Sequence, residues 1–322
     1  MEITLDQDYV RKLPVRSAKT SLSRLNDKTD SLSGSETERA MATIPEPELV
    51  QSTLILGAVV EARDPYTGGH LWRVAQIGKL IGQHMGMTRY ELFKLTLGGF
   101  IHDLGKIGIP DDILRKNGPL TNDEFDTMKT HPLIGADLME PHPLGSIVLD
   151  IIRHHHERWD GTGYPDGIGG DEITPSAAII NVADVFDALT SSRSYRGGLS
   201  AEEAMQIIEE GKGTHHRVEV VDTLQDLWRA GRLAHIAGHS SSTRTLVECL
   251  GCGPIIVLPE NVEDGALVDC PSCRGRYKIS LHGDTIHLSP TGEYALAKEA
   301  RIQGDSRGIT EIANDISELA AT

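Results

Sequence analysis

Histidine and aspartate residues recur in the middle of this 322-residue sequence at positions that suit metal binding. His102 and Asp103 are adjacent, and neutral imidazole together with carboxylate is a donor set that suits iron, manganese or zinc. Other candidates stand on what we expect to be separate helices: His70, His131, His154, His155, His156 and Asp184. A single buried histidine is more often a hydrogen-bonded core residue, but ligands from several helices can converge in a bundle core. The pattern therefore predicts a metal site inside a helical bundle.

All four cysteines lie in two Cys-x-x-Cys pairs. Cys249 and Cys252 form the first pair, Cys270 and Cys273 form the second, and 17 residues separate the pairs. This spacing is typical of a four-cysteine zinc ribbon. A redox or disulfide pair is the alternative, which a cytoplasmic context disfavours. We therefore expect structural zinc, whose binding would supply the folding energy of so small a domain.

Basic residues follow the second cysteine pair at Arg274, Arg276 and Lys278. They could contact nucleic acid or an acidic partner. They could also belong to a solvated turn of a module that docks a protein partner, and we favour this second interpretation.

The charge balance and the hydropathy disfavour several classes of protein. The chain has 31 basic and 47 acidic residues, and its formal net charge of −16 disfavours broad binding of nucleic acid by counterion release. An anionic substrate could still bind where a metal or local Lys and Arg neutralise its charge. No apolar run reaches the length of a membrane-spanning helix, and the amino terminus lacks the apolar segment of a secretory signal. We expect a cytoplasmic protein without a membrane segment.

Helical periodicity dominates from residue 47 to about residue 232. Capping-box pairs predict three helix starts, at Thr88 with Glu91, Thr121 with Glu124 and Ser200 with Glu203. We expect about eight helices and no strand before residue 235, followed by short strands where β-branched runs alternate with Gly and Pro. The predicted fold class is mainly α, with a helical bundle followed by a small β zinc-ribbon-like domain.

The sequence predicts four parts. Residues 1–45 are polar and lack periodicity, so we expect a flexible amino-terminal tail. Residues 46–235 form the helical bundle, and residues 244–288 form the four-cysteine zinc-ribbon-like domain. Residues 289–322 carry a weak helical pattern and are expected to be a tail or a short docking helix.

Five ordered blocks in the helical part resemble the HD-GYP family of the HD phosphohydrolase superfamily. The blocks are RDPYTGGH (63–70), HDLGKIGIP (102–110), HP (131–132), HHERWDGTGYP (155–165) and VADVFDALTSSRSYR (182–196). Their length and order argue against chance agreement. The resemblance implies that residues 46–235 are an HD-type helical bundle with metal-dependent phosphohydrolase activity.

This resemblance also implies a metal centre and a reaction. Members hold two or three metals, usually iron or manganese, with a hydroxide between them, and they hydrolyse the second messenger cyclic di-GMP to pGpG or onward to GMP. The positions that match the family's ligands are His70, His102, Asp103, His131, His155, His156 and Asp184. His154 lies just outside the matching positions, and we interpret it as an ordinary helix residue.

Further matching positions surround the phosphate. Lys106 matches a lysine that contacts the scissile phosphate, and Asp103 is the natural bridging ligand because each of its oxygens can reach a different metal. Asp103 and Lys106 are therefore the predicted catalytic residues. The predicted substrate contacts are Arg193 and Arg196 for phosphates, Tyr164 and Pro165 in the loop beside the pocket, and Asp64 for a base.

Two positions depart from the family pattern. Tyr66 stands where three-metal members have a glutamate ligand, so we predict a two-metal site and a reaction that stops at pGpG. His216, Arg217 and Val218 replace the usual Phe-Asp-Pro, and here we expect altered packing rather than lost chemistry.

Two alternatives to a cyclic di-GMP phosphodiesterase stay open. One is an HD-type phosphohydrolase of another nucleotide, such as a different cyclic dinucleotide. The other is an adaptor that binds cyclic di-GMP and signals through the zinc ribbon, although retention of all seven ligand positions favours catalysis. The expected partners are a cyclic dinucleotide, a protein bound by the ribbon and a second copy paired through the helix at 46–64.

Overall fold

This computed structural model describes residues 45–64, 68–116, 118–191, 199–234, 236, 239–242, 244–252, 255–259, 261–282, 285–296 and 306–320. The predicted amino-terminal tail therefore lies almost wholly outside the described residues, as do Tyr66, Arg193 and Arg196.

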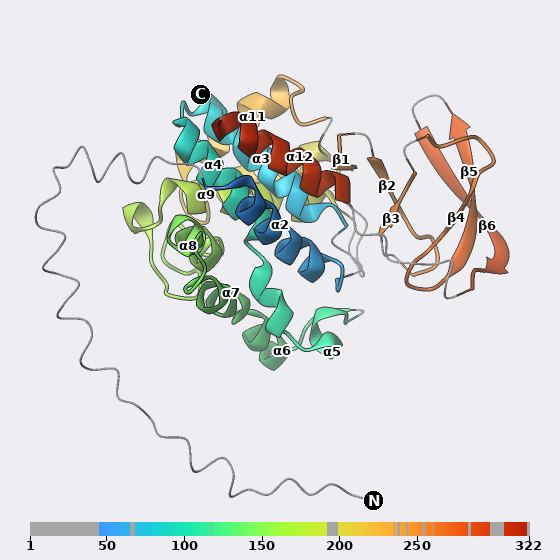
Figure 1. Ribbon diagram of the computed structural model, residues 1–322, viewed down its shortest axis with the longest axis horizontal. Helices are drawn as coiled ribbons and strands as arrows, with labels where there is room; N and C mark the ends of the chain where they lie inside the picture. The colour runs from blue at the N-terminus through green and yellow to red at the C-terminus, as the bar shows by residue number, and fades with distance from the viewer. Residues whose placement is uncertain are drawn as a thin grey trace, which may run out of the picture. The chain divides into compact units, whose positions relative to one another are not determined.

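The part of the chain before residue 235 is helical, as predicted (Figure 1). Its ten α-helices within the described ranges exceed the expected eight, because two short ones, α5 and α6, lie between the block at 102–110 and the block at 131–132. The helices are α2 (Pro47–Glu61), α3 (His70–His84), α4 (Arg89–Ile101), α5 (Asp111–Leu114), α6 (Asn122–Met128), α7 (His131–Met139), α8 (Gly145–His154), α9 (Pro175–Thr190), α10 (Ala201–Glu210) and α11 (Val218–Arg229). Two 3₁₀ segments, η2 (Leu104–Gly108) and η3 (Gly170–Glu172), join them.

All three predicted capping boxes are confirmed. At the starts of α4, α6 and α10 the Ser or Thr hydroxyl accepts from the third helical backbone N–H, and the glutamate accepts in return from the cap residue. These reciprocal bonds satisfy donors that a helix start otherwise leaves unpaired.

The core of the helical part forms around α3, α4, α8 and α9. Helix α9 is buried over most of its length, including Ile179, Ile180, Val182 and Phe186, as expected of a central helix that is apolar on several faces. Helix α4 approaches α8 closely at Gly98, where an added Cβ would lie 2.4 Å from the Ile151 side chain.

The carboxyl-terminal helix α12 (Ser306–Ala320) packs onto the same core. Ile312 and Ile316 are buried in it, and α12 contacts α2 and α4 (Figure 1). Residues 289–322 were expected to form a tail or a short docking helix; of these, residues 289–294 belong to a strand and residues 306–320 to α12.

In the sequence between α11 and α12, the described residues form six strands in two small antiparallel sheets. The first has the order β1 (His239–Ser241), β2 (Arg244–Glu248), β3 (Ile255–Val257), and the second has the order β4 (Leu267–Asp269), β5 (Gly275–His282), β6 (Thr285–Tyr294). Strand β5 alternates as a half-buried strand should, with Tyr277 and Ile279 buried on either side of exposed Lys278. Strand β6 runs to Tyr294, beyond the ribbon boundary expected at residue 288.

None of the described helices combines the length and the apolar character that a membrane crossing requires.

Candidate active site

Asp103 lies at the centre of the histidine and aspartate cluster, between α4 and η2. Its Oδ2 lies 3.5 Å from His70 Nε2 and 3.5 Å from His102 Nε2. His70 Nε2 also lies 3.4 Å from Asp184 Oδ1. The donor atoms of His70, His102 and Asp184 all lie within 4.8 Å of one another, and the three side chains are buried. We call these three residues the first triad.

The other carboxylate oxygen of Asp103 faces a second set of donors. Its Oδ1 lies 3.3 Å from His131 Nε2, which in turn lies 3.2 Å from His155 Nε2. Donor atoms of His131, His155 and His156 again lie within 4.8 Å of one another, and we call these residues the second triad. One carboxylate thus stands between two groups of three donors, with one oxygen toward each.

Helix ends orient three of these imidazoles. The Nδ1 atoms lie 2.8 Å from the backbone oxygen three residues earlier in the chain: His102 from Gly99, His131 from Met128 and His155 from Ile152. Those oxygens belong to the last turns of α4, α6 and α8, where carbonyls lack intrahelical partners. Each Nδ1 therefore donates to a helix end, and each Nε2 keeps its lone pair for the cluster.

The second triad reaches Asp103 because Gly105 has no side chain. A Cβ at this position in η2 would lie 1.9 Å from His131 O and 2.4 Å from Gly135 N. Any larger residue would push the start of α7, and His131 with it, away from Asp103.

His70 is oriented differently, by a buried ion pair that sequence reasoning missed. Asp187 Oδ2 lies 2.8 Å from His70 Nδ1, and Arg73 holds Asp187 through bonds of 2.5 Å to Oδ1 and 3.0 Å to Oδ2. Burial alone would lower the pKa of His70, but the hydrogen bonds that it donates to Asp103 and Asp187 raise it to about 9. Both residues lie three positions after a predicted ligand, Arg73 after His70 and Asp187 after Asp184. That helical spacing was the one available sign that they share a face with the ligands.

The donor chemistry fits divalent metal ions. His102 Nε2 is buried and has no hydrogen-bond partner among the described residues, which costs free energy unless the atom binds something else. Burial lowers the pKa of His102 and His155, so both imidazoles are neutral and have a free lone pair. Burial would raise the pKa of Asp103, but the charge of Lys106 and the adjacent histidines hold it well below its usual range. An ionised carboxylate beside the neutral imidazoles of His102 and His155 suits iron, manganese or zinc. A metal at the first triad would take the place of the proton on His70 Nε2.

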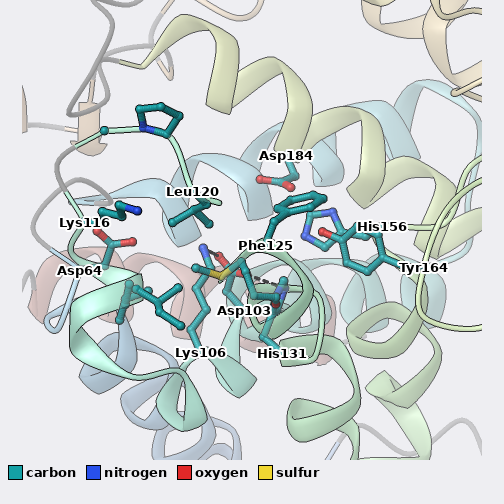
Figure 2. A pocket seen from close by; sticks show the side chains of 15 residues that line it. Asp64, Asp103, Lys106, Lys116, Leu120, Phe125, His131, His156, Tyr164 and Asp184 are labelled. Atoms are coloured by element: carbon teal, nitrogen blue, oxygen red, sulfur yellow. Dashed lines mark hydrogen bonds and ion pairs between the residues drawn. The ribbon is translucent and has the colours of Figure 1, made fainter. Parts of the chain in front are cut away.

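The cluster forms one end of a cavity of about 450 Å³ (Figure 2). Asp103, His131, His156, Tyr164 and Asp184 all line it. Lys106 lines it as well, with Nζ 2.6 Å from Asp103 Oδ2, so a cation lies next to the carboxylate at the base of the cavity.

The loop that carries Tyr164 is held by three buried side chains. Glu157 Oε1 accepts from the backbone N–H groups of Asp166 (2.7 Å) and Gly167 (3.0 Å). Asn181 donates to the backbone oxygens of His155 (2.9 Å) and Glu157 (3.3 Å). His216 Nδ1 lies 2.8 Å from Asn181 Oδ1 and donates to it, since the amide nitrogen is already a donor. The unusual His216 therefore supports the turn that carries part of the second triad.

The remaining predicted site residues have different placements. Asp64 lines the cavity, and Pro165 follows Tyr164 in the supported loop without lining the cavity itself. His154 lies 3.0 Å from Asp166 Oδ2 and belongs to neither triad. Arg193 and Arg196, expected to bind substrate phosphates, lie outside the described residues.

The four cysteines form a separate cluster. Sγ–Sγ distances are 3.6 Å for Cys249–Cys252, Cys249–Cys273 and Cys252–Cys270, far longer than a disulfide bond of about 2.05 Å. A tetrahedron of Zn–S bonds of about 2.3 Å has edges of about 3.8 Å, close to these separations. The donor set therefore fits zinc. In the predicted basic patch, Arg276 is bound to Asp269 by two hydrogen bonds of 2.7 and 3.0 Å, which leaves it less available to a partner.

Comparison with known proteins finds a match to the HD domain family model over residues 55–218. The chain is 40% identical over 183 residues to a probable cyclic di-GMP phosphodiesterase of Vibrio cholerae, covering 52% of this chain and 42% of that protein. It is 41% identical over 175 residues to a cyclic di-GMP phosphodiesterase of Thermotoga maritima, covering 54% and 48%. It is also 35% identical over 175 residues to the 3′3′-cGAMP-specific phosphodiesterase 2 of Vibrio cholerae, covering 54% and 34%. The matches thus span half or less of each of these three relatives.

Proposed function

Because this chain belongs to the HD domain family, we propose that it is a metal-dependent phosphodiesterase that hydrolyses cyclic di-GMP to linear pGpG. The observation that carries the proposal is the position of Asp103, whose two oxygens face two triads at one end of a cavity. The names of the relatives from Vibrio cholerae and Thermotoga maritima support the choice of substrate.

In this proposal Asp103 would hold both metals, and each triad would complete one ligand set. The first set would be His70, His102 and Asp184, and the second His131, His155 and His156. Iron or manganese is the metal pair that the family resemblance implies. When bound, two divalent cations would supply Lewis acidity toward the phosphodiester and generate a hydroxide nucleophile near neutral pH.

The chain's own residues bind the substrate and stabilise its charge. Lys106 lies at the base of the cavity, where its ammonium would stabilise negative charge that builds on the phosphate oxygens during attack. Asp64 and Tyr164 line the same cavity and are the proposed contacts to a base and to the substrate edge. Pro165 shapes the loop beside them, and Arg193 and Arg196 are proposed to bind phosphates.

The proposed end product is pGpG rather than GMP. The seven matching ligands divide into two triads that share Asp103, which accounts for two metals without an additional ligand. Tyr66 replaces the glutamate that a third metal would use, as the sequence comparison with the family implies.

We further propose that the four cysteines bind a structural zinc ion and that the ribbon docks a protein partner. A second copy of the chain would pair through α2, which exposes Ile55, Leu56 and Val59 to 47%, 46% and 55%. These exposed apolar side chains lie on adjacent positions of one helix surface, as a pairing helix requires.

A different cyclic dinucleotide is the second candidate substrate. The similarity to a relative named as 3′3′-cGAMP-specific favours testing it directly. Bases are distinguished by contacts to their edges, and Asp64 is the charged side chain proposed for such a contact.

The test is product analysis after anaerobic reconstitution with Fe(II) or Mn(II), using cyclic di-GMP and 3′3′-cGAMP as parallel substrates. We expect cyclic di-GMP to yield pGpG, and we expect no turnover from the His102→Ala, Asp103→Ala double variant. Preference for 3′3′-cGAMP would move the substrate assignment to the second candidate. Binding of cyclic di-GMP without turnover by fully metal-loaded protein would contradict the phosphodiesterase and support an adaptor.

A further inference from the structure

One part of the cavity wall is apolar. It is lined by Ile113 and Leu114 of α5, Leu120 and two residues of α6, Phe125 and Met128. Ionisable side chains line the rest of the cavity, the metal cluster with Lys106 on one side and Asp64 with Lys116 on the other (Figure 2). A ligand that fills the cavity would therefore need both charged and apolar parts.

Phe125 is the aromatic member of this apolar wall, and it is 47% exposed. A phenylalanine that served only the core would be buried, and Phe125 has no place in the core cluster of the helical part. Its ring lies 6.4 Å from the ring of Tyr164 at an angle of 81°, an edge-to-face contact. Tyr164 in turn lies 4.8 Å from the ring of His156 in the second triad. Aromatic groups therefore connect the metal cluster to the apolar wall.

The backbone that carries Phe125 is also held in place before any ligand binds. It stands one residue after Glu124, which completes the capping box of α6 with Thr121. Lys116 Nζ lies 2.5 Å from Glu124 Oε2 and joins the preceding segment to the same helix start. These bonds fix the backbone of the first turn of α6, which lowers the ordering cost of stacking on Phe125. The Lys129 ammonium lies over the Phe125 ring, 5.3 Å from its centroid, so a base would stack on the opposite face.

We propose that Phe125, with Leu120 and Met128 beside it, is a base-stacking subsite that binds one purine of the substrate. This inference rests on the proposed function, because a phosphodiester bound at the metal cluster directs its attached nucleosides along the cavity. A purine presents an apolar π face, and stacking on aromatic side chains is tolerant of base identity because every base has such a face. Phe125 therefore contributes affinity for purine nucleotides without distinguishing guanine from adenine.

The test measures binding of GMP, AMP and inorganic phosphate to metal-loaded protein by calorimetry. Phosphate probes the metal cluster alone, whereas the nucleotides also reach the apolar wall. We expect Phe125→Ala to lower the affinity for GMP and for AMP by a similar factor, at least about 5-fold, and to leave the affinity for phosphate unchanged within about 2-fold. Phe125→Trp keeps an aromatic face and should retain nucleotide affinity. Leu138→Ala, which removes another exposed apolar side chain that lies outside the cavity lining, is the matched control.

Three results would overturn the subsite. Unchanged nucleotide affinity in Phe125→Ala would show that no base stacks there. An equal loss of affinity for phosphate and for the nucleotides would show that the substitution acts on the metal cluster or on the fold. A loss confined to GMP would show edge recognition instead of stacking. Failure of wild-type protein to hydrolyse any cyclic dinucleotide would contradict the proposed function, yet the nucleotide comparison would still be readable.

Discussion

The histidine and aspartate cluster and the cysteine cluster are built in opposite ways. The seven donors of the first are spread over residues 70–184 and come from several helices and their ends, whereas the four cysteines lie within residues 249–273 beside two short strands. The first opens into a cavity, and the second has four sulfur donors at close to tetrahedral separations, with Tyr277 Oη 3.1 Å from Cys249 Sγ. A closed set of four ligands is the form of a structural site, and an open site admits substrate. Removing a donor from the first cluster should therefore abolish activity, whereas removing a donor from the second should unfold the small sheets around it.

The largest effect is expected from Asp103→Ala. Because both triads face this one carboxylate, the substitution should remove both metals rather than one, and activity should fall by about 1,000-fold or more. Metal analysis and turnover of cyclic di-GMP check the prediction. Retention of one tightly bound metal per chain would show that the triads are independent of each other.

Replacing Cys249 and Cys252 by serine should unfold the cysteine-containing region and leave the activity almost unchanged. Loss of the metal should unfold the two small sheets, because structural zinc contributes about 10 kcal/mol or more of folding free energy in comparable small domains. The helical part has its own core, so phosphodiesterase activity should stay within about 2-fold of wild type. Limited proteolysis, zinc analysis and activity measured together check this. Loss of activity in parallel with zinc would contradict the separation of the two regions.

An intermediate effect is expected from Asp187→Asn, which acts on only one triad. The amide would orient His70 poorly and leave Arg73 buried without its anionic partner. Removing a carboxylate behind a metal-binding histidine typically lowers metal affinity by about 10- to 100-fold. Metal titration of the variant measures this, with Asp137→Asn at an exposed position of α7 as the matched control. Equal metal affinities in the two variants would contradict a role of Asp187 in positioning His70.

The smallest effect should come from His216 and concerns how the free energy of unfolding depends on pH. Burial, with the charges of His215 and Arg158, lowers the pKa of His216 to about 4, against about 6.5 in an unfolded chain. Between these values the unfolded state binds a proton that the folded state does not, so stability present above pH 6.5 is lost as the pH falls toward 4. Over this pH range the free energy of unfolding of His216→Phe, measured by chemical denaturation, should fall less than that of wild type, by up to about 3 kcal/mol. Identical pH profiles for wild type and variant would contradict a buried neutral His216.

The sequence predicted the chemistry of both clusters better than the supports around them. The ligands occur in long contiguous blocks, and the capping boxes and cysteine spacing are local patterns, so each could be found without knowing the fold. Arg73 and Asp187 share a helical face with predicted ligands, but their pairing with each other, like the contact between Asn181 and His216, depends on which helices meet. Phe125 likewise became informative only when its exposure and its place in the cavity wall were known. In α12 the apolar residues Ile309, Ile312, Ile316 and Leu319 recur on one helical face, but the sequence does not show that α2 and α4 cover that face.

Electron paramagnetic resonance of the Mn(II)-loaded protein tests the shared carboxylate most directly. If Asp103 bridges two ions, wild type should bind two Mn(II) at the cluster and give an exchange-coupled spectrum. Asp103→Asn should abolish that coupling. An isolated six-line Mn(II) signal from wild type at full loading would contradict a bridged pair, and with it the proposed basis of the activity.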